Sequence, residues 1–221
     1  MKILRSLLTA CALGATLATP LGTPLATPVV AAPAAPPALP QGLDILAAHL
    51  AATRTMTADF KQTAMDGRVA TGKFLLQRPG KVRFAYEEGS PFLIVANGKS
   101  LVMIDYDSKQ VQRYPIGSTA LSVLLDSNPN LTRFARTLSS SATQLTVEAR
   151  DPKKPEYGVI TLFFARDAQA PGGLALYAWR VLDANGSVTQ IELSNTRFNV
   201  EVPASAFTYR DPRGHPGPRT R

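Results

Sequence analysis

A run of short segments with alternating apolar and polar residues, around the stretch from Gly72 to Gln112, most strongly limits how this chain can fold. Five such segments follow one another, at residues 70–78, 81–86, 92–96, 100–104 and 110–114. Alternation with a period of two is typical of half-buried β-strands. Pro79-Gly80 and Asn97-Gly98 are turn dipeptides, and the second is a strong two-residue hairpin signal. Strands joined by such short turns are expected to pair with their neighbours as an antiparallel meander.

The rest of the chain adds further strands and a few helices. Strands are predicted at residues 56–63, 144–150, 158–164, 174–182 and 188–195, helices at 43–53, 119–125 and 130–138, and a short turn at 203–207. The total is about ten or eleven strands, which makes the fold α+β and mainly β. A sheet of this length must curl, and its apolar concave face then needs a cover. The helix at 43–53 and the segment 119–138 are the available covers.

The N-terminus has the pattern of a secretory signal peptide. Lys2 and Arg5 form a charged region, and residues 7–18 form an apolar region that is too short to span a bilayer. Small residues follow, so cleavage is expected after Ala32, and residues 33–40 form a Pro/Ala-rich leader expected to be disordered. The protein is therefore expected to be exported across the inner membrane. Removal of the signal would lower the formal net charge from +8 to +6.

Cys11 allows two interpretations. Leu8 to Cys11 has the local pattern of a lipoprotein cleavage box, but cleavage there would leave almost no apolar region before it, so an ordinary signal residue is favoured. The globular domain is then expected at residues 41–210 without cysteine, followed by a basic tail at 211–221 without apolar periodicity. This tail is either a solvated end, which is favoured, or an electrostatic contact for an anionic membrane or an acidic partner.

Residues suited to catalysis or metal binding do not form a recognisable motif. His49 lies in a predicted helix and His215 in the tail, and neither accompanies a nucleophile or a metal-ligand spacing. Asp105 and Asp107 fall in a predicted turn, where aspartate commonly caps the backbone. The basic residues are scattered and do not accompany a stacking platform, which argues against nucleic acid. We therefore expect neither an enzyme nor a cofactor.

Arg78 has an unusual position, at the end of a strand and directly before Pro79. Strand parity places it on the same apolar face as Phe74 and Leu76. Its guanidinium carries five donors and can reach several backbone carbonyls at once. The alternative is an edge arginine that extends past Pro79 into solvent.

Several of these segments together resemble the outer-membrane lipoprotein carrier protein family, the periplasmic LolA chaperones. The resemblance is carried by Phe60-Lys61-Gln62, by Gly72 through Arg78-Pro79-Gly80, by residues 82–86 and by the hairpin at 97–101, and continues weakly to the C-terminus. The combination is moderately specific, whereas each piece alone is weak. Three positions depart from the family pattern: the family usually has Trp at Phe84, Asp at Asn97 and Tyr at Ile104.

The resemblance implies an unclosed antiparallel β-barrel with a helical lid. It also implies a monomeric periplasmic chaperone that takes lipoproteins from an inner-membrane ABC transporter and carries them to the outer membrane, where an acceptor is possible. In that family the strand-end arginine bonds backbone groups of the lid and holds the empty cavity closed, a role that maps onto Arg78. The alternative is a periplasmic lipid- or lipoprotein-sensing regulatory protein, because such proteins share the half-barrel.

The apolar face of the predicted barrel supplies the candidates for acyl-chain binding. They are Phe60, Phe74, Leu76, Val82, Phe84, Tyr86, Ile94, Leu101, Met103, Leu121, Leu124, Leu125, Phe134, Ile191 and Leu193.

Overall fold

The computed structural model describes residues 42–87, 89–118, 121–126 and 129–214. These residues form one eleven-stranded antiparallel sheet. Its strands are β1 (Thr55–Ala64), β2 (Val69–Gln77), β3 (Lys81–Tyr86), β4 (Phe92–Asn97), β5 (Ser100–Asp105), β6 (Gln110–Pro115), β7 (Ala135–Ser140), β8 (Gln144–Ala149), β9 (Val159–Arg166), β10 (Leu174–Leu182) and β11 (Val188–Phe198). The predicted signal peptide, the leader and the last part of the tail lie outside the described residues.

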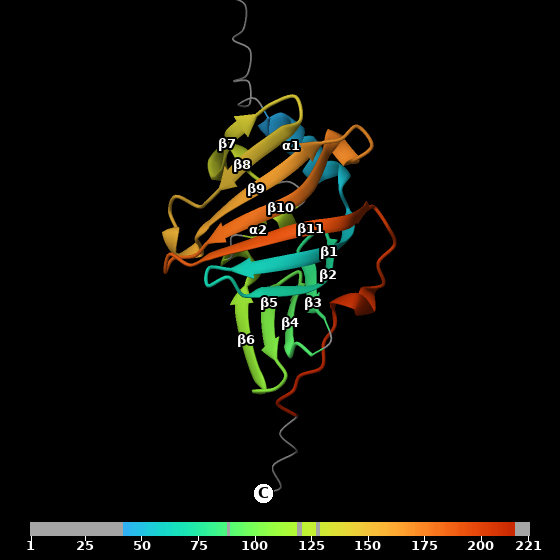
Figure 1. The fold of residues 1–221 in the computed structure, drawn as a ribbon, viewed down its shortest axis with the longest axis vertical. Coiled ribbons are helices and arrows are strands. Elements are labelled where there is room, and N and C mark those ends of the chain that lie inside the picture. The colour runs from blue at the N-terminus through green and yellow to red at the C-terminus, as the bar shows by residue number, and fades with distance from the viewer. Residues whose placement is uncertain (1–41, 88, 119–120, 127–128, 215–221) are drawn as a thin grey trace, which may run out of the picture. The chain divides into compact units, whose positions relative to one another are not determined.

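The strand order is β6-β5-β4-β3-β2-β1-β11-β10-β9-β8-β7. The sheet therefore consists of two meanders, which the pairing of β1 with β11 joins in the middle (Figure 1). Within the described residues β6 and β7 are edge strands and do not pair with each other, so the sheet is not closed. The predicted fold class, an unclosed antiparallel β-barrel of ten or eleven strands with few helices, is confirmed.

Side-chain alternation sets the register of the strands under the apolar face. In the β2–β3 pair, Phe74 lies opposite Phe84 and Leu76 opposite Val82, so four apolar side chains share one face. A shift by one residue would turn all of them to the other face. The predicted hairpin at Asn97-Gly98 is also confirmed, because Gly98 adopts a φ of 97° and the Asn97 side chain accepts hydrogen bonds from the amides of Lys99 and Ser100.

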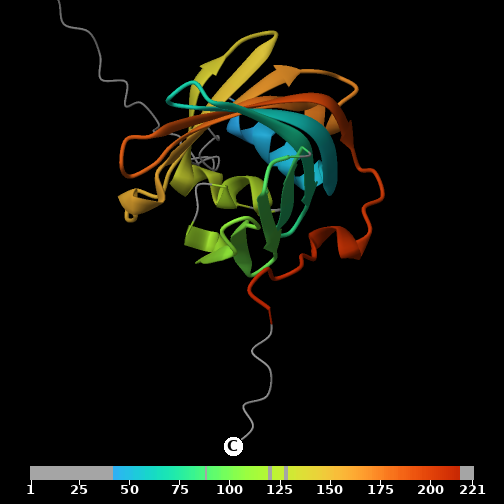
Figure 2. The same cartoon turned by 60° about the horizontal axis from the view of Figure 1, so that its bottom comes forward.

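The helices are short. They are α1 (Leu43–Ala52), α2 (Ser122–Leu125), α3 (Leu131–Phe134) and the 3-10 turns η1 (Ile116–Ser118), η2 (Pro155–Tyr157), η3 (Pro171–Gly173) and η4 (Ala204–Phe207). Figure 2 shows α1 and α2 on the concave side of the curved sheet. Leu43, Leu46 and Leu50 of α1 are buried there, which matches the helical spacing of its apolar residues.

The helix predicted at residues 130–138 is wrong beyond Phe134. It ends after one turn, and the chain continues as β7, which pairs with β8. Thr137 and the serines that follow have weak helix propensity, and the free edge of β8 offers backbone hydrogen bonds instead. Leu138, at the end of the predicted helix, is 45% exposed. Of the helix predicted at 119–125, residues 121–125 are described, and 122–125 of these form α2.

The sheet has apolar clusters on both faces. The larger cluster lies on the concave face under the helices. The smaller one lies on the other face of β4 and β5, where Leu93, Val95, Val102 and Ile104 pack against Phe207 of η4. Val202, Ala206 and Tyr209 also pack against this smaller cluster, so the segment 202–209 covers part of the convex face. The predicted turn at 203–207 is confirmed, but its packing role was not foreseen.

Candidate functional site

A row of aromatic rings runs along the concave face of β1, β2 and β3. Phe60 lies edge-on to Phe84 and to Tyr86, with ring centroids 5.4 and 5.1 Å apart. The row continues from Phe84 to Phe74 at 4.9 Å, and from Phe74 to Trp179 of β10 at 5.5 Å. Aromatic pairs at such separations stabilise an apolar interior beyond the area they bury. The concave face is therefore a continuous apolar surface.

The structure brings most of the candidates for acyl-chain binding together on this surface. Ten are buried in the concave cluster: Phe60, Phe74, Leu76, Val82, Phe84, Leu101, Leu124, Leu125, Ile191 and Leu193. Tyr86, Ile94 and Leu121 are partly buried against it.

Two candidates lie elsewhere. Met103 is 41% exposed and lines an open cavity. Phe134 is half-buried beneath the guanidinium of Arg133 and lines a separate cavity of about 180 Å³.

Trp179 is the largest interior side chain that the sequence analysis missed. It is 1% exposed and contacts both Phe74 and Phe84. Counting every second residue from Leu174 and Leu176 places Trp179 on the convex face. A bulge between Leu176 and Ala178 reverses this parity and turns Trp179 inward. A bulge of this kind has no clear signal in a single sequence.

Arg78 connects the end of β2 to both helices that cover the concave face. Its Nη1 donates a hydrogen bond to the carbonyl oxygen of Thr53, just after α1, at 2.6 Å. Its Nε donates to the carbonyl oxygen of Leu124 in α2 at 2.8 Å. Two backbone hydrogen bonds join the same segments. The amide of Arg78 donates to the carbonyl oxygen of Arg54, and the amide of Gly80 donates to that of Leu125, each at 2.8 Å. The strand end therefore holds α1 and α2 through four hydrogen bonds, and the side chain does not extend into solvent.

Two ionisable groups beneath the helices are strongly influenced by burial. Burial lowers the pKa of Arg78 to about 10, and the nearby Asp126 opposes this shift. Burial also lowers the pKa of His49 in α1 to about 4. The His49 ring lies edge-on to Phe164 and Phe198, and its Nδ1 is 2.8 Å from the carbonyl oxygen of Pro171. His49 is therefore neutral near pH 7, and α1 is packed as an apolar element.

An open cavity of about 470 Å³, here called the outer cavity, continues the concave face beyond the helices. It is lined by Gln62, Ala64, Arg68, Val69, Ala70, Tyr86, Ser90, Phe92, Leu93, Ile94, Met103, Ile104, Asp105, Gln110 and Gln112. Tyr86 forms the wall between this cavity and the packed interior. Its hydroxyl donates to Gln62 Oε1 at 2.7 Å, and burial raises its pKa to about 12.

The candidates for polar chemistry have structural roles. Asp105 Oδ1 accepts hydrogen bonds from the amides of Asp107 and Ser108, so this carboxylate caps the turn before β6. The hydrogen bonds from Ser108 lower the pKa of Asp105. Across the described ranges, no three His, Cys, Asp or Glu residues gather in a group that could hold a metal ion. None of the helices in those ranges has the length and hydropathy needed to cross a membrane.

These features define a class of protein: an unclosed β-barrel with an apolar interior, covered by short helices that are hydrogen-bonded to a strand end. The family profile described as Outer membrane lipoprotein carrier protein LolA matches residues 51–210. The chain belongs to this family.

The chain is also similar to individual proteins of known sequence or structure. A protein of Legionella pneumophila (strain Paris) named outer-membrane lipoprotein carrier protein is 32% identical over 181 residues, which cover 77% of this chain and 86% of the relative. A Chromobacterium violaceum protein of the same name is 30% identical, with coverages of 76% and 83%. The crystal structure of a LolA superfamily protein from Nitrosomonas europaea is 11% identical and aligns with a TM-score of 0.43 over 76% of this chain and 97% of that one. The Pseudomonas aeruginosa MucA/MucB complex is 13% identical and aligns with a TM-score of 0.46 over 76% of this chain and 61% of that one. The family assignment rests on the sequence matches.

Proposed function

We propose that this protein is a periplasmic carrier that binds the acyl chains of lipoproteins and takes them from the inner to the outer membrane. The observation that carries the proposal is the continuous apolar interior closed by Arg78, whose guanidinium bonds α1 and α2 to the end of β2. Membership of the lipoprotein carrier family and the names of the relatives support it.

The closed interior provides a way to moderate the affinity for lipid. Burial of an alkyl chain stabilises a complex by about 0.8 kcal/mol per CH₂, so one chain of about sixteen carbons contributes on the order of 10 kcal/mol. Cargo bound with that full free energy would leave very slowly. In the structure the interior is occupied by its own side chains, since Phe74, Leu76 and Val82 are each 1% exposed. Lipid therefore has to displace these contacts and the hydrogen bonds of Arg78, which lowers its net affinity.

Closure of the lid, which consists of α1 and α2, also favours release of the cargo. A hydrogen bond from a charged group contributes roughly 1.5–3 kcal/mol, so the two side-chain bonds of Arg78 can bias the protein strongly toward the closed state. Closure expels the acyl chain to an acceptor that binds it more tightly. We propose that an inner-membrane ABC transporter loads the carrier and that an outer-membrane acceptor, or the outer membrane itself, receives the cargo. Export to the periplasm by the N-terminal segment belongs to the same proposal.

The experiment uses vesicles that contain a triacylated lipoprotein and its releasing transporter. After addition of the protein and ATP, the lipoprotein is expected in a soluble one-to-one complex, and a second population of acceptor membranes is then expected to recover it. Failure to form the soluble complex would overturn the proposal. A complex that keeps its lipid in the presence of acceptor membranes would favour the lipid-sensing alternative.

A further inference from the structure

The outer cavity stands open although the helices cover the rest of the concave face. Val69, Phe92 and Met103 line it and are 57, 51 and 41% exposed. Exposed apolar side chains gathered around one cavity mark binding sites more often than scattered ones do. A volume of about 470 Å³ lies within the usual range for small-molecule sites, about 300–1,000 Å³.

The chemistry of the cavity favours a hydrocarbon chain over a peptide. Its floor is formed by β4 and β5, which are hydrogen-bonded to neighbouring strands on both sides. A peptide backbone on this floor would lose its hydrogen bonds to water, and the backbone groups of β4 and β5 are already paired, so this loss would be costly. An alkyl chain has no such groups to satisfy. At the rim, the neutral side chains of Gln62, Gln110 and Gln112 suit the ester and amide groups to which such a chain is attached.

The two charged residues of the cavity are already engaged. Arg68 Nε donates to Asp66 Oδ2 at 2.6 Å, and the Asp105 carboxylate caps the following turn. Both belong to turns at the ends of strands. The floor is apolar, because Ile94 and Met103 lie directly opposite each other in the β4–β5 pair.

The outer cavity is continuous with the row of rings in the interior. Phe92 lies 6.4 Å from Tyr86, and Tyr86 lies 5.1 Å from Phe60, measured between ring centroids. Tyr86 is therefore the junction between the cavity and the packed interior. The hydrogen bond from its hydroxyl to Gln62 holds it at this place.

We propose that the outer cavity binds one alkyl chain while the lid is still closed, and that Tyr86, held by Gln62, separates this chain from the interior. Rotation of Tyr86 then admits the chain along the row of rings. The inference rests on the proposed function and divides the site into an outer cavity that is always accessible and an interior that opens.

Two tryptophan reporters distinguish these compartments. Trp179, the one tryptophan of the chain, reports on the interior. The double variant Phe92→Trp/Trp179→Phe reports on the outer cavity, and Trp179→Phe alone gives the background. The probe is a long-chain N-acyl amide brominated at the end of the chain, because bromine quenches tryptophan on contact. Rapid mixing then records the order in which the two reporters are quenched.

The expected result is fast quenching of the Phe92→Trp reporter, followed by slower quenching of Trp179. Quenching of Trp179 alone, or first, would overturn the inference and leave the proposed function intact. Absence of quenching at both sites would overturn both. Equal displacement of the probe by an apolar peptide without lipid would show that the cavity is a peptide site instead.

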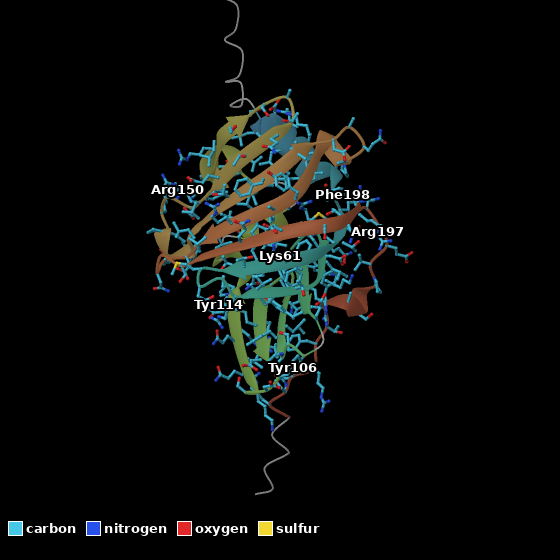
Figure 3. The ribbon with its side chains drawn as sticks, viewed as in Figure 1. Lys61, Tyr106, Tyr114, Arg150, Arg197 and Phe198 are labelled. Carbon is cyan, nitrogen blue, oxygen red and sulfur yellow. The ribbon has the colours of Figure 1, made fainter. Side chains whose placement is uncertain are left out.

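Substitutions in the full chain test each part separately. Met103→Lys is expected to weaken cavity quenching at least tenfold without lowering the melting temperature, whereas Leu182→Lys, a change at a side chain of the same 41% exposure in β10, should have no effect on quenching. Tyr86→Phe keeps the ring and removes the bond to Gln62, so Trp179 quenching should become about 2- to 10-fold faster. Tyr114→Phe removes a similar hydrogen bond, to Gln112 at 2.8 Å, from an exposed position labelled in Figure 3, and should leave the rate of Trp179 quenching unchanged. An unchanged rate in Tyr86→Phe would refute the role of Tyr86.

Discussion

The guanidinium of Arg78 donates a hydrogen bond to the carbonyl oxygen of Thr53, which closes the turn after α1 against the end of β2. The same side chain donates a second hydrogen bond, to the carbonyl oxygen of Leu124 in α2. Two covering elements that are far apart in the sequence are thus held by one residue. Loss of that residue should loosen both elements at once.

Arg78→Leu should therefore fold but close poorly. The carbonyl groups of Thr53 and Leu124 lose their charged donor, which costs about 1–3 kcal/mol if they stay buried. We expect faster amide hydrogen exchange in α2 and at the end of α1, and a melting temperature lower by several degrees. Arg180→Leu, at an exposed position of β10, is the matched control and should leave both unchanged. Equal exchange in the native protein and in Arg78→Leu would contradict the account.

Acid should destabilise the closed protein through His49. Its pKa is lowered from 6.5 to about 4 in the fold, so the unfolded or open state binds the proton more readily. The stabilisation due to neutral His49 is complete above pH 6.5 and is lost as the pH falls from 6.5 toward 4. The shift implies a loss of roughly 2 kcal/mol between pH 7.5 and pH 5.

Urea unfolding at these two pH values measures the loss. The charged group facing His49 is Arg78, which stays protonated throughout. His49→Gln retains a polar donor without titrating and should remove most of the difference. If His49→Gln loses the same free energy of unfolding between the two pH values, the loss is due to carboxylates and not to His49.

Gly72 is required by the close approach of β1, β2 and β3. A Cβ at this position would overlap the carbonyl oxygen of Ala85 and would lie 2.8 Å from the ring of Phe60. Gly72→Ala should lower the free energy of unfolding by about 1–3 kcal/mol, since the strands cannot move apart without breaking the ladder. Gly117→Ala, where a Cβ meets nothing within 4 Å, should be close to neutral in the same measurement. An unchanged free energy of unfolding in Gly72→Ala would show that the strands can move apart to accommodate the methyl group.

The segment 202–209 should contribute to stability, whereas residues beyond Arg210 should not. Phe207 is 5% exposed, and Arg83 Nη1 donates to the carbonyl oxygens of Ala206 and Thr208 at 3.3 and 3.0 Å. Truncation after Arg210 should keep the melting temperature, because the ion pair of Asp211 with Arg213 is exposed and local. Truncation after Glu201 should lower the free energy of unfolding by about 3–5 kcal/mol, the range for removal of a buried phenylalanine. Equal melting temperatures of the two truncated chains would show that the segment 202–209 does not stabilise the fold.

Alternation along the strands predicted most of the fold. The faces of β1, β2 and β3 follow directly from residues such as Phe60, Phe74 and Phe84, because each strand is regular and one face is apolar. The bulge in β10 breaks that regularity, so the inward position of Trp179 could not be counted from the sequence. The apolar spacing at 131, 134 and 138 fits a helix locally, but pairing with β8 decides the structure of residues 135–140.

The features outside the concave core depend on contacts between distant segments. The cluster that contains Val95 and Phe207 joins segments more than a hundred positions apart, and no local pattern indicates it. The outer cavity combines side chains of β1 to β6, and among the acyl-chain candidates predicted from the sequence only Tyr86, Ile94 and Met103 line it. The position of Arg78 was visible, whereas its acceptors, Thr53 and Leu124, required the folded chain.

The transfer of a triacylated lipoprotein by Arg78→Leu tests the central claim most directly. Soluble complexes of the native protein and of the variant are prepared with the same lipoprotein and mixed with acceptor membranes, and the lipoprotein recovered in the membranes is followed with time. The account predicts that Arg78→Leu binds the lipoprotein at least as well and delivers it at least about tenfold more slowly, because closure no longer competes with the acyl chain. Delivery by the variant at the native rate would show that the hydrogen bonds of Arg78 do not control release.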